Sequence, residues 1–476
     1  MSDFERISRN SIYSFLSISF RLVSNVLLFW LIARYYGKDL FGQFSTAQTF
    51  AAIFVLFADF GLDMLLTTEI PKDISRAREL FQRYFSIKLF LTIIAFIAMV
   101  GIAVSGKFDS QVNQLLIIFG FYAAFTTLSN FLYALFRGFE KLGYETIVSF
   151  FVNFFTLILI LTLIILEKNI ITISLSFVGM RFLGFIVAIY YAHKILPDIT
   201  FKPSFKDVRK ILNQVLIFGL FLVFGNLYFQ LDTILIAYLL DTESVGIYQS
   251  VFKLVVLPLI IPEIFIGSIL PALARLYSNE IEKWDRIGFS LYKLLVFISI
   301  PISIILFVYP HQIILLIYGA EYVEAIPILR IFSIIVFLRF FSETYGLMLT
   351  SSLRQKMRMY VVLGATFFNL LLNLLLIPKI GIVGAAITSL STNLLVAFLF
   401  IIITKSFSLV WIKKVLSIKL VIVSICLYLI LFFLGKFGFW MVGILSVIPY
   451  FLFVYYGLLS VQERDYLSIS KLLRRR

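Results

Sequence analysis

The sequence has few of the residues on which soluble enzymes and small secreted domains depend. Only 14% of its 476 residues are charged, against about 25% in a typical soluble chain. Its one cysteine, Cys426, cannot close a disulfide within the chain, and its two histidines, His193 and His311, cannot build a histidine-rich metal site. These absences exclude a soluble enzyme and a disulfide-stapled domain. We expect no catalytic residues and no metal site.

Long apolar segments dominate the sequence instead. Hydrophobic residues make up 61% of the chain, and its mean hydropathy is +1.02. A helix needs about 20 apolar residues to cross a bilayer, so we predict an all-α integral membrane protein with fourteen transmembrane helices and short connections. We interpret the first span as a retained anchor, because it is too long for a signal peptide. The predicted spans are residues 11–34, 41–63, 85–106, 112–135, 146–166, 170–192, 211–238, 245–270, 290–316, 325–350, 359–377, 382–404, 418–435 and 438–460.

The basic residues predict how these spans are oriented. Of the 41 lysines and arginines, 29 fall in predicted loops on one side, six in loops on the other side and six within spans. Positively charged loops stay in the cytoplasm, so we predict cytoplasmic termini and a bacterial inner membrane location. The net charge of +15 then follows from topology, and we expect no nucleic-acid partner. The basic tail, residues 471–476, is expected to lie against anionic headgroups.

The two halves of the sequence repeat each other. Leu-Ile-Ala, followed by a glycine and an aromatic residue, occurs within residues 31–44 and again within 235–248. Asn153 in the fifth span also matches Asn369 in the eleventh. We therefore predict two parallel six-helix lobes that work by alternating access, with the substrate between them. The predicted parts are the lobes 1–193 and 211–404, a cytoplasmic linker 194–210, and helices 13 and 14 with the basic tail, 405–476.

A motif in the second half combines amides, a proline and small residues. Asn369 and Asn373 are one turn apart and share a helix face. Their amides need partners in hydrocarbon, so this face is expected to point inward, toward another helix or toward substrate. Pro378 is expected to end one helix, and Gly381 to permit the bend that follows. Gly384 and the alanines after it would let the next helix approach closely.

This motif resembles the Asn-rich helix, Pro-x-x-Gly turn and Gly-Ala-Ala helix start of polysaccharide-export flippases. Shorter matches occur in the same order earlier in the chain, at residues 59–61, 136–138, 246–248 and 318–322. The chain as a whole resembles a Wzx-type flippase for O-antigen or other polysaccharide repeat units, in the multidrug/oligosaccharidyl-lipid/polysaccharide (MOP) exporter superfamily. The resemblance implies a substrate, an undecaprenyl-diphosphate-linked oligosaccharide, that is flipped from the cytoplasmic to the outer leaflet without enzymatic chemistry or a cofactor. It also implies contact with membrane lipid and with polysaccharide polymerase machinery.

Cations within the spans are the candidate substrate-binding residues. A lysine or arginine at the bilayer centre costs about 2.5–3.5 kcal/mol, so it must face water, an acid or a substrate. Arginine binds phosphate oxygens through two parallel hydrogen bonds, which suits a diphosphate. Lys88 lies near the end of its predicted span, so we expect it to reach the cytoplasmic interface. We predict a cationic lumen formed by Arg21, Arg181, Lys253, Arg339 and Arg330; the alternative for each is an ion pair that joins two helices.

Five acids lie in or near the spans, and each is a candidate for an ion pair or for coupling to H⁺ or Na⁺. We expect Asp232 to pair with Lys253, and Glu343 to pair with Arg339 one turn away. Pro258 and Pro262 are expected to break or kink the eighth span near Glu263. The candidate acids are Asp59, Asp63, Asp232, Glu263 and Glu343.

Four alternative functions can be compared with the flippase hypothesis, and one of them fits the sequence equally well. The cations within the spans and the two extra spans argue against a multidrug exporter of the same superfamily. A peptidoglycan-precursor flippase shares the chemistry and the number of spans, and this alternative stays open. A sugar polymerase or ligase would need a large outer loop for its catalytic residues, and the predicted outer loops are short. The buried charges argue against a purely structural scaffold.

Overall fold

The computed structural model describes the backbone of residues 3–197, 199, 201–434 and 439–458. The side chains of 3–22, 217, 218, 221, 226, 228, 229, 434, 439–442 and 444 also lie outside the description. All regular elements in the described part are helical, which confirms the predicted all-α class. Contacts divide the chain into two compact units, residues 1–250 and 251–476. The predicted six-helix lobes rest on the sequence repeat and stay a prediction.

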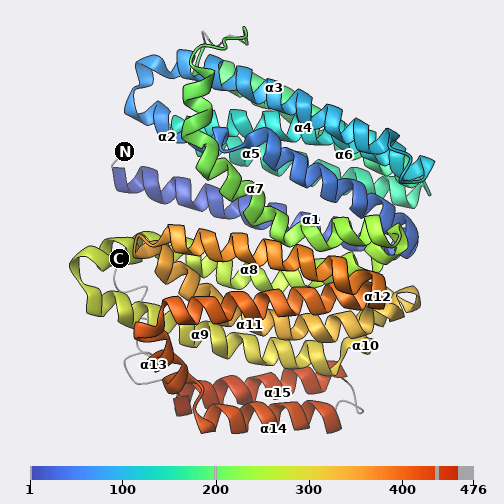
Figure 1. Cartoon of the computed structure of the whole chain (residues 1–476), viewed down its shortest axis with the longest axis vertical. Coiled ribbons are helices and arrows are strands. Elements are labelled where there is room, and N and C mark those ends of the chain that lie inside the picture. Colours follow the sequence, from blue (N-terminus) through green and yellow to red (C-terminus); the bar gives the residue numbers. More distant parts are fainter. Residues whose placement is uncertain (1–2, 198, 200, 435–438, 459–476) are drawn as a thin grey trace. The chain divides into compact units, whose positions relative to one another are not determined.

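The first unit consists of long helices that run side by side (Figure 1). Its core combines aliphatic and aromatic side chains, and Phe81, Phe131 and Phe136 are fully buried. Two short 3₁₀ turns separate its second and third helices. The elements are α1 (Asp3–Asp59), α2 (Leu62–Glu69), η1 (Ile70–Lys72), η2 (Ile74–Arg76), α3 (Ala77–Val104), α4 (Ser110–Gly138), α5 (Leu142–Ile165), α6 (Ile170–Ile195), α7 (Val208–Leu239) and the start of α8 (Thr242–Asn279).

The second unit begins within α8 and is again helical. In its core, the ring of Trp411 packs against those of Tyr292 and Tyr345, with centroid separations of 5.8 and 6.1 Å. The remaining elements are α9 (Ile281–Val308), α10 (Pro310–Ile317), η3 (Ala320–Ala325), α11 (Ile326–Ser351), α12 (Gln355–Ile403), α13 (Lys405–Val415), α14 (Ile418–Leu434), α15 (Phe439–Phe453) and the π-helical segment Val454–Leu458.

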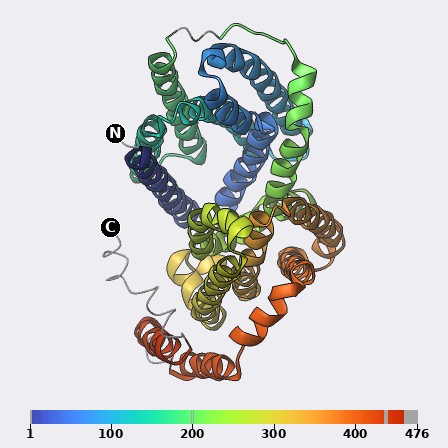
Figure 2. The ribbon, with the colours of Figure 1, turned by 90° about the vertical axis from the view of Figure 1, so that its left-hand side faces the viewer.

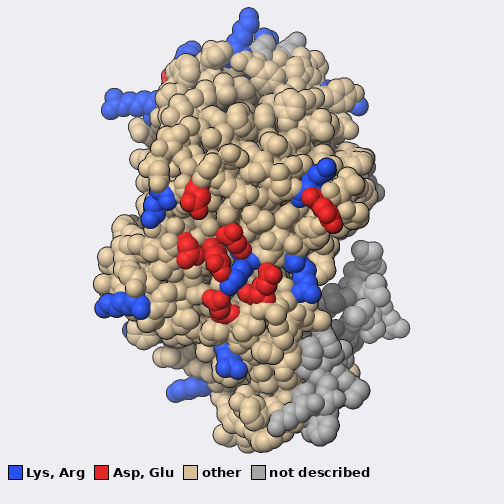
Figure 3. Space-filling model, turned by 90° about the vertical axis from the view of Figure 1, so that its right-hand side faces the viewer, with Lys and Arg blue, Asp and Glu red and all other residues tan. Residues whose placement is uncertain are grey.

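The helices are apolar on the outside as well as in the core. Large side chains such as Phe151 and Ile165 are exposed, an arrangement that suits a bilayer rather than water. Within the described residues, nine helices are long and apolar enough to cross a membrane, or ten if α13 and α14 form one bent span. The face shown in Figure 3 is mainly uncharged. The chain is thus a multi-pass membrane protein, and the count of fourteen spans stays a prediction.

The two longest helices each contain a break at a glycine. Gly37 in α1 has φ 73°, and Gly381 in α12 has φ 62°, both in the region that favours glycine. Just after the second break, a Cβ on Gly384 would lie 2.6 Å from the carbonyl oxygen of Leu376, so the two arms of α12 pack closely. The predicted turn at Pro378, and the close approach at the small residues, are confirmed.

Buried amides join the two arms of α12. Asn369 Nδ2 donates to Thr392 Oγ1 at 3.4 Å, and Asn373 Nδ2 donates to Asn369 Oδ1 at 3.0 Å. Both asparagines are almost completely buried. Of the two roles predicted for this face, the structure shows hydrogen bonding between helices.

α8 is continuous, although three prolines lie inside it. The helix runs from Thr242 to Asn279 through Pro258, Pro262 and Pro271. Of the break or kink predicted near Glu263, the break is therefore wrong, and the kink stays a prediction. Each proline removes one backbone hydrogen bond, and transmembrane helices tolerate this loss when neighbouring groups supply partners.

The segment between α6 and α7 is attached to α3. Arg83 Nη1 lies 2.9 Å from Asp207 Oδ2, and the Ser204 amide donates to Ser86 Oγ at 2.6 Å. Figure 2 looks along the helices and shows the described part of this segment at one end of the first unit. The start of α7 is thereby held on the first unit.

α1 and α8 touch through their backbones at two glycines. A Cβ on Gly42 would lie 1.8 Å from the carbonyl oxygen of Thr242, and a Cβ on Gly246 would lie 1.9 Å from that of Lys38. Lys38 Nζ also pairs with Glu243 Oε1 at 2.6 Å. Each of the two glycines, which are equivalent in the sequence repeat, thus lies against the backbone of the other helix.

Candidate functional site

A buried lysine holds two carboxylates together in the first unit. Lys88 Nζ of α3 lies 2.8 Å from Asp59 Oδ1 and 2.7 Å from Asp63 Oδ1. The lysine side chain is completely buried, and the aspartates are 15% and 16% exposed. Lys88 Nζ also lies 5.9 Å from the centre of the Phe131 ring. The group combines two acidic side chains with one basic side chain. Its stability therefore depends on the bonds that Lys88 makes.

A sharp turn between α1 and α2 places both carboxylates on Lys88. Phe60 and Gly61 have positive φ values of 43° and 87°. Asp59 accepts hydrogen bonds from the amides of Gly61 at 3.3 Å and Asp63 at 3.1 Å, which fixes its carboxylate across the turn. The ion-pair role predicted for these aspartates is thus present in the structure.

The prediction that Lys88 reaches the cytoplasmic interface is wrong. α3 begins at Ala77, eight residues before the predicted span, so Lys88 lies about three turns inside the helix. Its side chain is completely buried and paired with Asp59 and Asp63, so it does not extend to an interface. One sequence feature indicated these ion pairs: two aspartates four positions apart, on the same predicted side of the membrane as Lys88.

Arg181 is held by an aromatic ring and not by an acid. It lies near the middle of α6, is half-buried, and donates from Nη2 to Tyr122 Oη at 3.3 Å. Its guanidinium carbon lies 5.4 Å from the centre of the same ring, a cation–π contact. No acid among the described residues pairs with Arg181. Its charge is therefore positioned within a membrane span and not neutralised there.

In the second unit, Glu343 lies between two arginines. Arg339 Nη2 and Arg358 Nη2 each lie 3.7 Å from a Glu343 oxygen, and Arg358 Nη1 donates to Thr350 Oγ1 at 3.1 Å. The predicted pair of Arg339 with Glu343 is confirmed, and Arg358 of α12 is a partner that the sequence did not indicate. Glu263 on α8 is exposed and close enough to interact electrostatically with Arg339 and Glu343.

The side chains of three other predicted site residues are described, and that of Arg21 is not. Arg21 falls in α1, but its side chain is outside the described residues. Asp232 is buried and accepts a hydrogen bond from the Tyr248 hydroxyl at 2.5 Å. Lys253 is half-buried, and Arg330 is exposed near the start of α11. The predicted cationic lumen therefore stays a prediction.

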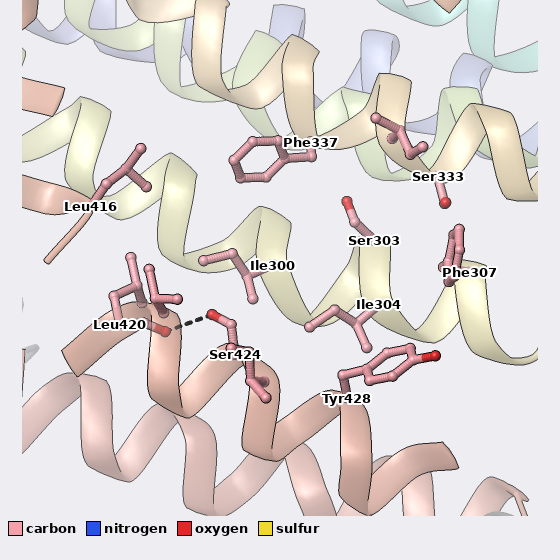
Figure 4. A pocket seen from close by; sticks show the side chains of 13 residues that line it. Ile300, Ser303, Ile304, Phe307, Ser333, Phe337, Leu416, Leu420, Ser424 and Tyr428 are labelled. Carbon is pink, nitrogen blue, oxygen red and sulfur yellow. Dashed lines mark hydrogen bonds between the residues drawn. The ribbon is translucent and has the colours of Figure 1, made fainter. Parts of the chain in front are cut away.

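An apolar cavity of about 460 Å³ lies between α9, α11 and α14 in the second unit. Ile300, Ile304 and Phe337 form part of its wall, and the Ser424 hydroxyl bonds back to the Leu420 carbonyl at 2.7 Å (Figure 4). The lining therefore offers mainly hydrocarbon surface. Such a cavity suits an alkyl or isoprenoid chain and does not suit an oligosaccharide.

Known relatives are found by sequence and by fold. Residues 7–277 match the family described as polysaccharide biosynthesis protein. The chain is 26% identical over 409 residues to an uncharacterized membrane protein of Methanocaldococcus jannaschii, covering 78% of this chain and 80% of that protein. It is 23% identical over 189 residues, 40% of each chain, to the probable low-salt glycan biosynthesis flippase Agl15 of Haloferax volcanii.

Two solved structures share the architecture. The lipid II flippase MurJ, in an inward closed conformation, aligns with a TM-score of 0.76 at 16% identity, over 96% of this chain and all of that one. A multidrug resistance MATE-family transporter of the MOP superfamily aligns with a TM-score of 0.64 at 15% identity, over 85% and 99% of the two chains. The fold is that of MOP-superfamily membrane transporters. Because the family match spans more than half of the sequence, the chain belongs to the polysaccharide biosynthesis protein family, as the resemblance to Wzx-type flippases predicted.

Proposed function

We propose that this protein flips an oligosaccharide linked to a polyprenyl diphosphate, such as undecaprenyl diphosphate, from the cytoplasmic to the outer leaflet. The product would supply a surface polysaccharide such as the O-antigen of lipopolysaccharide or a capsule. Membership of the polysaccharide biosynthesis family, the MurJ-like fold and the similarity to a probable glycan flippase support this proposal.

Arg181 is the observation that carries the proposal. A guanidinium in a membrane span is expensive unless a partner compensates it. The other charges described within each unit largely have such partners: Lys88 has two aspartates, and Arg339 has Glu343. Arg181 has a tyrosine ring that orients it and leaves its net charge available. A diphosphate or an acidic sugar supplies the missing negative charge, and the planar guanidinium fits two of its oxygens.

Flipping moves the lipid-linked oligosaccharide from one leaflet to the other and breaks no covalent bond. A polar headgroup crosses the hydrocarbon region only if protein groups replace its hydration. The polyprenyl chain has no such need, and the apolar cavity between α9, α11 and α14 offers it a hydrocarbon-lined surface. We propose that the headgroup meets cationic side chains such as Arg181 and Arg21 while the chain stays in an apolar environment.

The remaining features of the mechanism follow from the same proposal. Alternating access of two lobes, driven by an H⁺ or Na⁺ gradient, would supply direction. The protein would lie in a bacterial inner membrane with both termini in the cytoplasm, near polysaccharide polymerase machinery. A peptidoglycan-precursor flippase would use the same cations and differs in the sugar carried. A multidrug exporter would be expected to offer acids or aromatic rings to cationic drugs, and the uncompensated Arg181 favours an anionic substrate.

Arg181→Ala is expected to abolish surface polysaccharide in cells that lack their own copy, while the protein still accumulates in the membrane. Removal of one charge-assisted contact to phosphate costs about 1.5–3 kcal/mol, roughly a tenfold to hundredfold loss in binding. Arg181→Lys should restore export only in part, because an ammonium lacks the planar fork. Arg21→Ala and Arg21→Lys should follow the same order. Export is read from extracted surface polysaccharide, and abundance from an immunoblot of membranes.

Lys107→Ala serves as the matched control, since Lys107 is exposed outside the predicted spans and its loss should leave export unchanged. A structural role of Arg181 would appear as reduced protein abundance instead of reduced export per molecule. Normal export by Arg181→Ala at normal abundance would rule out the substrate role.

A further inference from the structure

α13 is a short amphipathic helix that bends away from the apolar helix that follows it. Its axis is bent by 56° from that of α14, and it lies between α12 and α14 at one end of the second unit (Figure 1). The predicted topology places this end in the cytoplasm. The helix therefore lies where the cytoplasmic leaflet has its headgroups.

One face of α13 is fixed to the protein by aromatic packing. Trp411 and Val415 are buried, and the Trp411 ring lies 4.6 Å from Phe407 and 6.0 Å from Phe289 of α9, centroid to centroid. The Ser408 hydroxyl donates to the Ile401 carbonyl at 3.0 Å. The orientation of α13 is thus set by the core, and its opposite face is presented outward.

The outward face combines apolar side chains with three lysines. Leu409 and Val410 are 51% and 48% exposed at the middle of the helix. Lys405 lies one turn before them, and Lys413 and Lys414 lie one turn after them, all exposed. Apolar side chains flanked by lysines are typical of a helix that lies in a membrane interface.

The lysines on this face keep their charge available. No acid in the described residues forms an ion pair with any of the three. Asp285 of α9 interacts electrostatically with Lys414, but its carboxyl group is also bonded by Trp411, and it offsets at most one cation. Lys414 Nζ lies 5.6 Å from the centre of the Phe289 ring, which orients it. The face keeps a net positive charge.

We propose that the outward face of α13 binds anionic phospholipid of the cytoplasmic leaflet. Leu409 and Val410 contact the acyl chains near the headgroups, while Lys405, Lys413 and Lys414 bind the lipid phosphates. Each lysine near an anionic surface adds attraction that a zwitterionic lipid does not provide. This surface is independent of the transported substrate.

Lipid quenching in nanodiscs tests the proposal. A fluorophore is attached at Ser406→Cys, on the exposed face, in a Cys426→Ser background of the full chain. The discs contain phosphatidylcholine with either brominated phosphatidylglycerol or brominated phosphatidylcholine at equal mole fraction. We expect quenching by both, with an apparent association about tenfold stronger for phosphatidylglycerol at low salt. Lys413→Gln combined with Lys414→Gln should remove most of that preference.

Lys202→Gln combined with Lys206→Gln is the control, because it removes the same charge from exposed lysines on the same predicted side. It should leave the preference intact. Quenching by neither lipid would show that α13 lies outside the membrane. Equal quenching by both lipids, or equal loss in the control, would show that α13 has no anionic lipid site. Each result overturns the proposal without bearing on substrate export.

Discussion

Lys88→Met is expected to strongly reduce the amount of folded protein. The substitution leaves Asp59 and Asp63 nearly buried, with two negative charges and no cation to compensate them. Breaking a buried pair by removing one partner typically destabilises a protein by about 3–5 kcal/mol. Protonation of the aspartates would lower the cost of the buried negative charge, but it would not restore the bonds to Lys88. Membrane abundance and the thermal midpoint of the detergent-purified protein measure the effect.

Two further variants make this prediction specific to the ion pairs. Lys72→Met removes an exposed lysine that pairs with Glu69 at 2.8 Å and should change the midpoint little. Lys88→Met combined with Asp59→Asn and Asp63→Asn leaves a neutral group and should recover much of the lost stability. If Lys88→Met melts like the wild type, or the triple variant is no better than the single one, the account of this site is wrong.

Gly42→Ala is expected to destabilise the first unit to a similar degree. The added Cβ would lie 1.8 Å from the Thr242 carbonyl oxygen, a backbone atom that cannot move without shifting α8. Overpacking a tight contact costs about 1–3 kcal/mol and more where the backbone must separate. Gly246→Ala should be equally severe, because its Cβ would lie 1.9 Å from the Lys38 carbonyl oxygen. The thermal midpoint of each purified variant is the readout.

Gly101→Ala is the matched control. Gly101 is also a helical glycine, and its Cβ would meet nothing within 4 Å. Alanine favours a helix over glycine by up to about 1 kcal/mol, so this variant should be as stable as the wild type or more stable. Equal stability of Gly42→Ala and Gly101→Ala would contradict the described contact between α1 and α8.

Features determined by local chemistry could be predicted from the sequence. The turn around Pro378 and Gly381 follows from the limits that these residues place on the backbone, and the pair of Arg339 with Glu343 follows from helical spacing. The repeat identified Gly42 and Gly246 as equivalent positions, although it could not show that they touch. The apolar composition alone was sufficient to predict an all-α membrane protein.

Other features depended on where helices begin and on what lies opposite them. Lys88 was misplaced because apolarity marks only part of α3, which begins eight residues earlier in its polar first turns. Tyr122 lies on α4, far in sequence from Arg181, and no spacing rule connects them. Arg358 reaches Glu343 from a different helix in the same way. Pairings between helices need the packed structure.

Transport by the purified protein tests the central claim most directly. The full chain is reconstituted into liposomes with a fluorescent undecaprenyl-diphosphate disaccharide in both leaflets, and an impermeant reductant bleaches whatever reaches the outer leaflet. With H⁺ and Na⁺ gradients imposed in either direction, we expect the wild type to expose the inner-leaflet label under at least one gradient. Arg181→Ala should bleach like protein-free liposomes, and fluorescent phosphatidylcholine should not be moved by either protein. If the wild type matches protein-free liposomes under every gradient, or moves both lipids alike, the proposed function is contradicted.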